Sequence, residues 1–215
     1  MLKKNTTTLV ITALLTALVL ICTLLLRIPC GPDCYIHLGD AVILLAVMIL
    51  PRKYACFAGA VGATLADLMG GFAFWAPWTF CVKLLMVLTY GIFVDKAKAL
   101  TSSRETLSGK TDAAASSNAV NAAESVSKTT DGPATICGIP RIEFIGLVLA
   151  CIVAVGGYFV SEMILFGQWL GALACVGFNT VQVVVDAIVA VLVSNSLYSS
   201  NMRNSVYYRR PMQHR

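Results

Sequence analysis

The sequence predicts an all-α integral membrane protein with six transmembrane helices. Of its 215 residues, 58% are hydrophobic and only 13% are charged, which leaves too little polar surface for a soluble domain of this length. The apolar residues form continuous blocks rather than alternating with polar ones, and this pattern favours helices over the strands of a barrel. About 20 residues of helix cross the roughly 30 Å hydrocarbon core of a bilayer.

Six apolar blocks are candidate transmembrane helices. They are residues Thr8–Leu26, Ile36–Leu50, Tyr54–Gly71, Thr79–Val94, Ile142–Phe166 and Leu170–Val193. The second block is short, so we expect it to be tilted little or to begin in a buried loop. The first follows Lys3 and Lys4, as in a signal peptide. It has no small-x-small cleavage site before a polar mature chain, so we expect it to remain as a membrane anchor.

The distribution of Lys and Arg predicts that both termini are cytoplasmic. If the N-terminus is inside, only Arg27 falls on the outside and Lys83 falls within a helix, whereas every other basic residue is inside. The net charge of +5 then follows from topology and gives no reason to invoke nucleic acid. We expect a multi-pass protein of the bacterial cytoplasmic membrane. Its outer aromatic belt would consist of Tyr35, Trp75, Trp78 and Trp169.

Composition divides the chain into four parts. Residues 1–96 hold helices one to four, 97–140 form a cytoplasmic linker, 141–196 hold helices five and six, and 197–215 form a basic cytoplasmic tail. The linker is rich in Ser, Thr, Ala and Asn and has too few large apolar residues to offset its ordering entropy. We therefore predict a flexible segment, whose Ala content allows transient helix. We interpret the basic residues of the tail as keeping it on the cytoplasmic side of the membrane, rather than as a site that recognises a specific lipid.

The eight cysteines do not indicate a metal site. Most lie in apolar blocks, where Cys is a small packing residue. Cys30 and Cys34, in "CGPDC", are on a predicted outer loop, where free thiols or a disulfide are both possible. With His37 they give three of the four ligands that a zinc site needs, and no fourth is evident. We predict no metal and no cofactor.

Small residues recur at helical spacing in two of the predicted helices. In the third helix they form one face that lets another helix approach closely. This face consists of Ala55, Gly59, Ala63, Ala66 and Gly70. The first helix carries Ala13 and Ala17 in "ALLTALVL", the same small-xxx-small pattern, which is a weak signal on its own.

Polar side chains inside the apolar blocks are the candidate ligand-binding groups. Asp67 lies at the outer end of the third helix, and Lys83 lies too deep in the fourth to reach the interface easily. We expect Lys83 to pair with Asp67 or with a ligand acceptor. Tyr158 and Glu162 are four residues apart, so they share one face of the fifth helix.

The last helix carries the stretch "GFNTVQVVVDAIVA". Its Asn179, Gln182 and Asp186 follow the spacing i, i+3, i+7 and therefore share a face. An amide both donates and accepts hydrogen bonds, which suits a neutral polar heterocycle. Hydrogen bonds between helices are the alternative role, and for Asp186 the two roles are equally well supported.

The outer loops have the composition of a small-molecule pocket. "PCGPDCYIHLGD" and "GFAFWAPWT" mix aromatic residues with a few polar groups, as pocket walls do. An interfacial aromatic belt is the alternative interpretation of the tryptophans.

These segments resemble the S components of energy-coupling-factor (ECF) transporters, in the group that takes riboflavin, hydroxymethylpyrimidine or pyridoxine. The matching text is "YIHLGDAVILLAVMILPRKYACFAGAVGATLADLMGGFAFWAPWTFCVK", "GGYFVSEMILFG" and "FNTVQ". The resemblance implies six helices, cytoplasmic termini and an outer ligand pocket. Its implied pocket residues are His37, Asp67, Trp75, Lys83, Tyr158, Glu162, Asn179 and Gln182. It also implies that Ala13 and Ala17 contact a transmembrane coupling subunit, which acts with two ATPase subunits.

The predicted function is capture of a water-soluble vitamin or precursor for ATP-driven uptake by those partners. The sequence has no G-x-x-x-x-G-K-[ST] phosphate loop, so the partners must use the ATP. Amides and few cations favour a hydroxymethylpyrimidine or pyridoxine-like ring, with riboflavin as the alternative. An intramembrane enzyme using His37, Glu162 and Asp186 is disfavoured because no hydrolase motif is present. A membrane scaffold would not explain why polar groups gather at one depth.

Overall fold

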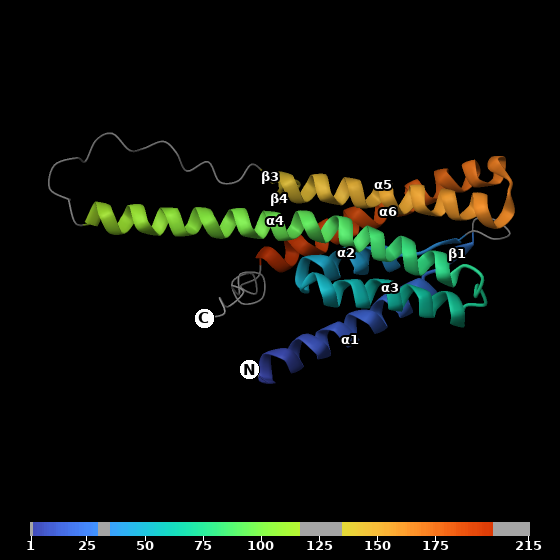
Figure 1. Cartoon of the computed structure of the whole chain (residues 1–215), viewed down its shortest axis with the longest axis horizontal. Helices are drawn as coiled ribbons and strands as arrows, with labels where there is room; N and C mark the ends of the chain where they lie inside the picture. Colours follow the sequence, from blue (N-terminus) through green and yellow to red (C-terminus); the bar gives the residue numbers. More distant parts are fainter. Residues whose placement is uncertain (1, 30–34, 117–134, 200–215) are drawn as a thin grey trace.

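The computed structural model describes residues 2–29, 35–116 and 135–199, and in these residues it is an all-α protein (Figure 1). The described part contains six helices and two short β-hairpins, so the predicted helix number is confirmed there. In chain order the elements are α1 (Leu2–Leu25), β1 (Ile28–Pro29), β2 (Tyr35–Ile36), α2 (Gly39–Ile49), α3 (Arg52–Met69), α4 (Ala76–Ser116), β3 (Thr135–Ile136), β4 (Ile139–Pro140), α5 (Arg141–Phe166) and α6 (Trp169–Ser199).

Four of the helices are long and apolar enough to cross a bilayer. The spanning segments are Thr6–Leu25, Ala76–Ser103, Arg141–Phe166 and Trp169–Ser196. Helix α2 has 11 residues and covers only about 16 Å, about half of the hydrocarbon core. Helix α3 has 18 residues but is rich in Ala and Gly and begins with Arg52 and Lys53. The prediction of six spanning helices is therefore confirmed as six helices, of which four have the length and composition of a span.

The helices run along one axis and place their connections at two ends (Figure 1). The start of α1, the α2–α3 connection and the start of α5 lie toward one end. The β1–β2 hairpin, the α3–α4 connection and the α5–α6 turn lie toward the other, which we name the hairpin end. Helix α4 packs against α3 and α5, α1 against α3, and α2 against α6. The assignment of the hairpin end to the outside of the cell stays a prediction.

Helix α3 packs through the predicted small-residue face. Its buried residues include Ala55, Ala58, Gly59, Ala63 and Ala66. A Cβ on Gly59 would lie 2.9 Å from Cγ2 of Ile43 in α2, and a Cβ on Gly62 would lie 2.9 Å from the carbonyl oxygen of Thr16 in α1. Atoms this close must shift to admit a side chain, so the absence of one lets α3 approach α1 and α2 closely.

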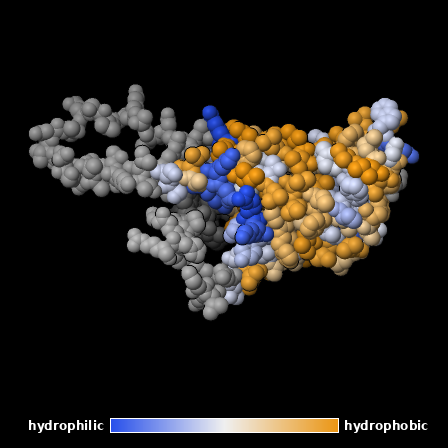
Figure 2. Space-filling view, in the orientation of Figure 1, coloured by the Kyte–Doolittle hydropathy of each residue, from blue (hydrophilic) through white to orange (hydrophobic). Residues whose placement is uncertain are grey.

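The face of the bundle that Figure 2 shows is apolar over the middle of its length. Large exposed side chains include Leu14 and Ile21 of α1, Ile152 of α5 and Leu192 of α6. A band of this extent suits a lipid environment rather than water. Hydrophilic residues gather at the edge of the band away from the hairpin end (Figure 2).

Helix α4 continues past the boundary predicted near residue 97 and ends at Ser116. The hydroxyls of Thr101 and Ser103 donate to the carbonyls of Ala97 and Ala99, one turn earlier. Residues 97–116 contain no proline, and Ala, Lys, Leu, Arg and Glu are good helix formers. Residues 97–116 of the predicted linker are therefore helical in the structure, and the assignment of 97–140 as a linker stays a prediction. Its residues 117–134, the tail 200–215, and Cys30 and Cys34 lie outside the described residues.

Candidate functional site

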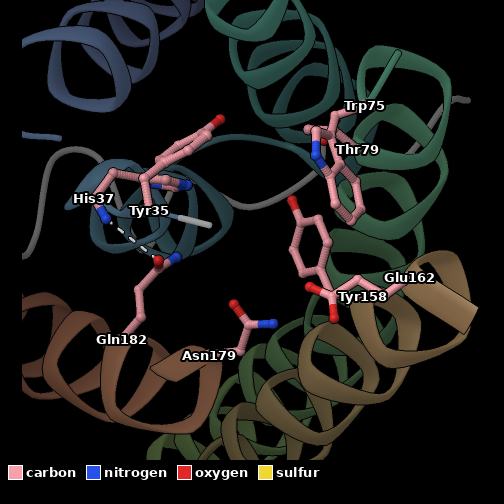
Figure 3. Close-up of a pocket in the computed structure, with 8 residues that line it drawn as sticks. All are labelled: Tyr35, His37, Trp75, Thr79, Tyr158, Glu162, Asn179 and Gln182. Atoms are coloured by element: carbon pink, nitrogen blue, oxygen red, sulfur yellow. Dashed lines mark hydrogen bonds between the residues drawn. The ribbon is translucent and has the colours of Figure 1, made fainter. Parts of the chain in front are cut away.

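A cavity opens between β2, α4, α5 and α6 near the hairpin end of the bundle (Figure 3). It encloses about 420 Å³ of space between atoms, part of which is open to solvent. Eight residues line it: Tyr35, His37, Trp75, Thr79, Tyr158, Glu162, Asn179 and Gln182.

Six of the eight predicted pocket residues line this cavity. They are His37, Trp75, Tyr158, Glu162, Asn179 and Gln182. Their role in binding a substrate stays a prediction, but the geometry brings them together from separate parts of the chain. Asp67 and Lys83 are not among the lining residues, but each contacts one of them: Asp67 contacts Tyr35 and Lys83 contacts Tyr158.

Two lining residues, Tyr35 and Thr79, were missing from the predicted pocket. Tyr35 was assigned to the aromatic belt, but β2 turns it toward the cavity beside His37, with ring centroids 5.7 Å apart. Thr79 lies one helical turn after Trp75, and its backbone N–H donates to the Trp75 carbonyl at 2.9 Å. The i, i+4 spacing from Trp75 was the signal that would have identified Thr79.

Aromatic rings form one side of the cavity. Trp75 and Tyr158 pack edge to face with ring centroids 6.2 Å apart and an interplanar angle of 66°, a favourable geometry. Phe166, at the end of α5, supports Trp75 with its ring centroid 6.0 Å away. The buried indole Nε1 of Trp75 has no hydrogen-bond acceptor among the described residues, so a ligand acceptor would satisfy it.

Amide groups from α6 form the facing side. Gln182 is 5% exposed, and its Oε1 accepts a hydrogen bond from the backbone N–H of His37 at 3.2 Å (Figure 3). Its Nε2 donates to Oδ2 of Asp40 at 3.3 Å. Asn179 lies one turn earlier on the same helix and points toward the cavity (Figure 3). The two amides therefore offer both donors and acceptors to a ligand.

A buried ion pair lies behind the amide side. Nζ of Lys83 is 2.7 Å from Oδ2 of Asp40, and the two side chains are 0% and 1% exposed. The predicted partners of Lys83, Asp67 or a ligand, are therefore corrected to Asp40. Asp40 lies in the first turn of α2, where the helix dipole favours a carboxylate. The ammonium of Lys83 also lies 4.8 Å from the ring centroid of Tyr158, so the pair contacts both sides of the cavity.

Asp67 supports the cavity through Tyr35. Its Oδ1 accepts a hydrogen bond from the Tyr35 hydroxyl, while the Arg27 guanidinium lies over the Tyr35 ring, 4.2 Å from its centroid. Burial, and then the charge of Asp67, raise the pKa of Tyr35. The phenol therefore stays protonated and keeps donating. Nη1 of Arg27 also contacts the carbonyl of Gly70 at 3.4 Å, which ties the hairpin to the end of α3.

His37 is neutral at physiological pH. Its burial, together with the charges of Lys83 and Arg27, lowers its pKa from 6.5 to about 4, although Asp40 acts in the opposite direction. Nδ1 of His37 accepts a hydrogen bond from the backbone N–H of Gly39 at 3.0 Å. The ring proton is therefore assigned to Nε2, which makes that atom a donor.

The remaining predicted residues lie away from the cavity. Ala13 and Ala17 are exposed on α1 and so are open to contact with another helix. Asp186 is buried, 1% exposed, and neither of its carboxylate oxygens has a hydrogen-bond partner in the described part of the chain. It shares the helix face of Gln182 but does not line the cavity.

Comparison with protein families gives a match. A family model described as "ECF-type riboflavin transporter, S component" matches residues 3–116, which is more than half of the 215-residue chain. The matched range runs from α1 to the end of α4 and contains four of the cavity residues: Tyr35, His37, Trp75 and Thr79. No curated protein matches the chain.

Proposed function

The chain belongs to the family of ECF-type transporter S components, and from this premise we propose that it captures riboflavin in the cavity at the hairpin end. An S component is the substrate-binding subunit of a vitamin transporter and not an enzyme. The observation that carries the proposal is the cavity itself, in which an aromatic side faces an amide side. The family description names riboflavin, and the chemistry of the lining supports that substrate.

The lining suits a neutral, planar, polar ring. Trp75 and Tyr158 offer aromatic surface, and the amides of Asn179 and Gln182 match a ring edge that carries carbonyl and N–H groups. The flavin ring has such an edge. Glu162 would accept hydrogen bonds from the hydroxyls of the flavin side chain. No Lys or Arg is among the lining residues that the structure describes, which favours the free vitamin over a phosphorylated form.

The hydroxymethylpyrimidine or pyridoxine-like substrate favoured by the sequence analysis is the second candidate. Its basis was the combination of amides with few cations, and the cavity has that combination. A flavin ring satisfies the same criteria, and its larger aromatic surface would cover more of the Trp75 side. We therefore place riboflavin first, and both classes belong in the binding test.

We further propose that the hairpin end faces the outside and that the partners bind elsewhere on the molecule. The family implies a transmembrane coupling subunit and ATPase subunits as partners. Exposed Ala13 and Ala17 on α1 give the coupling subunit a surface of small residues for close helix contact. In this arrangement the chain is a multi-pass protein of the bacterial cytoplasmic membrane.

The test is a thermal-stability panel on the purified protein, with riboflavin, hydroxymethylpyrimidine, pyridoxine and unrelated vitamins. A ligand that binds only the folded state at 100 times its Kd stabilises that state by about 2.7 kcal/mol, so the true substrate should raise Tm clearly. We expect riboflavin to do so. Stabilisation by pyridoxine or the pyrimidine alone would select the second candidate. No stabilisation by any vitamin would contradict substrate capture.

A further inference from the structure

The buried Asp40–Lys83 pair has a second consequence, which rests on the proposed function. We propose that Asp40, held by Lys83, is a positioning residue that fixes the orientation of the Gln182 amide, and so decides where its Oε1 and Nε2 atoms lie relative to the ligand. The pair would thereby determine selectivity without touching the ligand.

The Gln182 amide is held at both of its ends. On one side, the backbone N–H of His37 is only a donor and therefore selects Oε1, at 3.2 Å. On the other, the Asp40 carboxylate, paired with Lys83, is only an acceptor and selects Nε2, at 3.3 Å. Rotating the amide by half a turn would place donor against donor and acceptor against acceptor. Both contacts therefore select the same orientation.

Lys83 is what makes Asp40 suitable for this task. The Lys83 ammonium lies 2.7 Å from Oδ2 of Asp40, and both side chains are buried. An ionised carboxylate has no proton to donate, whereas a neutral carboxylic acid, a hydroxyl or an amide at this position would both donate and accept. The charge pair thus removes an ambiguity in the hydrogen bonding of Gln182.

The fixed amide has one N–H and one oxygen lone pair left for a ligand, in a set order. A ring edge that carries a carbonyl beside an N–H satisfies both groups. A ligand in which the N–H is replaced by N–CH₃ leaves the remaining lone pair of the Gln182 oxygen without a donor, and a fixed amide cannot turn to relieve this. Sites built to bond a polar group reject analogues that lack it.

The test compares two ligands on the full chain in detergent: riboflavin and its N3-methyl analogue. The test variant combines Asp40→Asn with Lys83→Gln, because removing both charges avoids an unpaired buried ion. The matched control is Arg52→Gln with Asp95→Asn. This removes a second ion pair, in which Nε of Arg52 lies 3.3 Å from Oδ2 of Asp95, and which is half-exposed and outside the cavity lining. Kd is measured for both ligands, and the ratio of the two values is the readout.

We expect the wild type and the control to prefer riboflavin by roughly tenfold or more, the loss expected for one unsatisfied buried acceptor. In the variant that carries both Asp40→Asn and Lys83→Gln, the ratio should fall to about threefold or less, because the amide is then held at one end only, by the backbone N–H of His37, and turns at the cost of that single contact. If this variant does not fold, Asp40→Ser with Lys83→Met replaces it, because a hydroxyl also donates and accepts.

An unchanged ratio in a folded variant, even with weaker binding of both ligands, would overturn the positioning role. That result would make the pair purely structural and leave the proposed function intact. If the wild type bound neither ligand, riboflavin capture itself would fail and the positioning role with it. Titration of the wild type separates these two results. The wild type binds riboflavin if only the positioning role fails, and it binds neither ligand if the proposed function fails.

Discussion

At the scale of the residue, the structure explains why an apolar helix contains amides. Gln182 connects α6 to His37, which precedes α2, and to Asp40, in the first turn of α2. It lines the cavity as well. One side chain thus serves packing and recognition together. Its neighbour Thr180 is exposed, and its hydroxyl donates to the carbonyl of Val176 in its own helix. Gln182 and Thr180 therefore contrast a residue that lines the cavity with one on the exposed surface of the same helix.

Gln182→Met is expected to weaken riboflavin binding by roughly ten- to a hundredfold, because a ligand polar group loses its partner in a buried site. The substitution keeps the length of the side chain. Titration of the purified protein with riboflavin measures the change. Thr180→Val is the control and should leave Kd within about twofold. Equal riboflavin affinities for wild type and Gln182→Met would show that Gln182 does not contribute to binding.

His37 predicts a pH dependence of stability. Its pKa is about 4 in the folded protein against 6.5 ordinarily, so below pH 6.5 the unfolded chain binds a proton that the folded protein does not. His37 therefore costs the folded state nothing above pH 6.5, and its destabilising contribution grows as the pH falls toward 4. His37→Gln should flatten the fall in Tm over that interval.

The measurement is the difference in Tm between wild type and His37→Gln at about pH 4.5, where the contribution of His37 is large, and at about pH 7.5, where it is absent. The other histidine of the sequence, His214, provides the control variant His214→Gln. A difference that does not change with pH would show that His37 titrates normally in the folded protein.

At the scale of the element, close helix packing depends on single glycines in α3. A Cβ on Gly62 would lie 2.9 Å from the Thr16 carbonyl oxygen and 3.0 Å from Cβ of Val19, and neither atom can move without shifting α1. Gly62→Ala should therefore destabilise the protein by about 1–3 kcal/mol. Thermal unfolding in detergent measures the effect.

Gly156 in α5 is the matched control, because a Cβ there would meet nothing within 4 Å. Gly156→Ala should leave stability unchanged or raise it by up to about 1 kcal/mol, the helix preference of Ala over Gly. Equal effects of the two substitutions would contradict the packing of α1 on α3.

Enlarging the exposed small residues of α1 is expected to impair assembly with the coupling subunit and not to affect binding of the vitamin. Ala13→Leu with Ala17→Leu should reduce co-purification with the coupling subunit while leaving riboflavin affinity unchanged, because both positions are exposed and outside the cavity lining. Val160→Phe, an enlargement at an exposed position of α5, is the control. Normal assembly of the double variant would place the coupling surface elsewhere.

At the scale of the whole molecule, the sequence predicts what depends on composition and helical spacing. The apolar blocks predict six helices, the Ala and Gly spacing of α3 predicts its packing face, and the i, i+3 spacing of Asn179 and Gln182 predicts that they share a face. Pairings between distant helices are not predictable this way. Lys83 pairs with Asp40 and not with Asp67 because of how α2 and α4 are aligned along their lengths. That alignment is set by tertiary packing, which the spacing of residues within one helix does not reveal.

Element ends and short strands were the other features that the sequence did not predict. Two-residue β2 leaves no alternating pattern to detect, yet it turns Tyr35 toward the cavity. Helix α4 continues to Ser116 because no proline ends it, although the polar composition of those residues indicated a linker. The polar composition of a segment therefore indicates that it is exposed to solvent, but it does not determine whether its backbone is helical.

The most direct test of the account is to identify the small molecule that the protein carries. The protein is purified natively in mild detergent, then denatured, and the released compound is identified and quantified by mass spectrometry. We predict riboflavin at a stoichiometry near one per chain. A stoichiometric pyrimidine or pyridoxine-like compound would keep the capture function and change the substrate. Protein that carries no small molecule and is stabilised by no vitamin would contradict capture and leave the cavity polar groups as ties between helices.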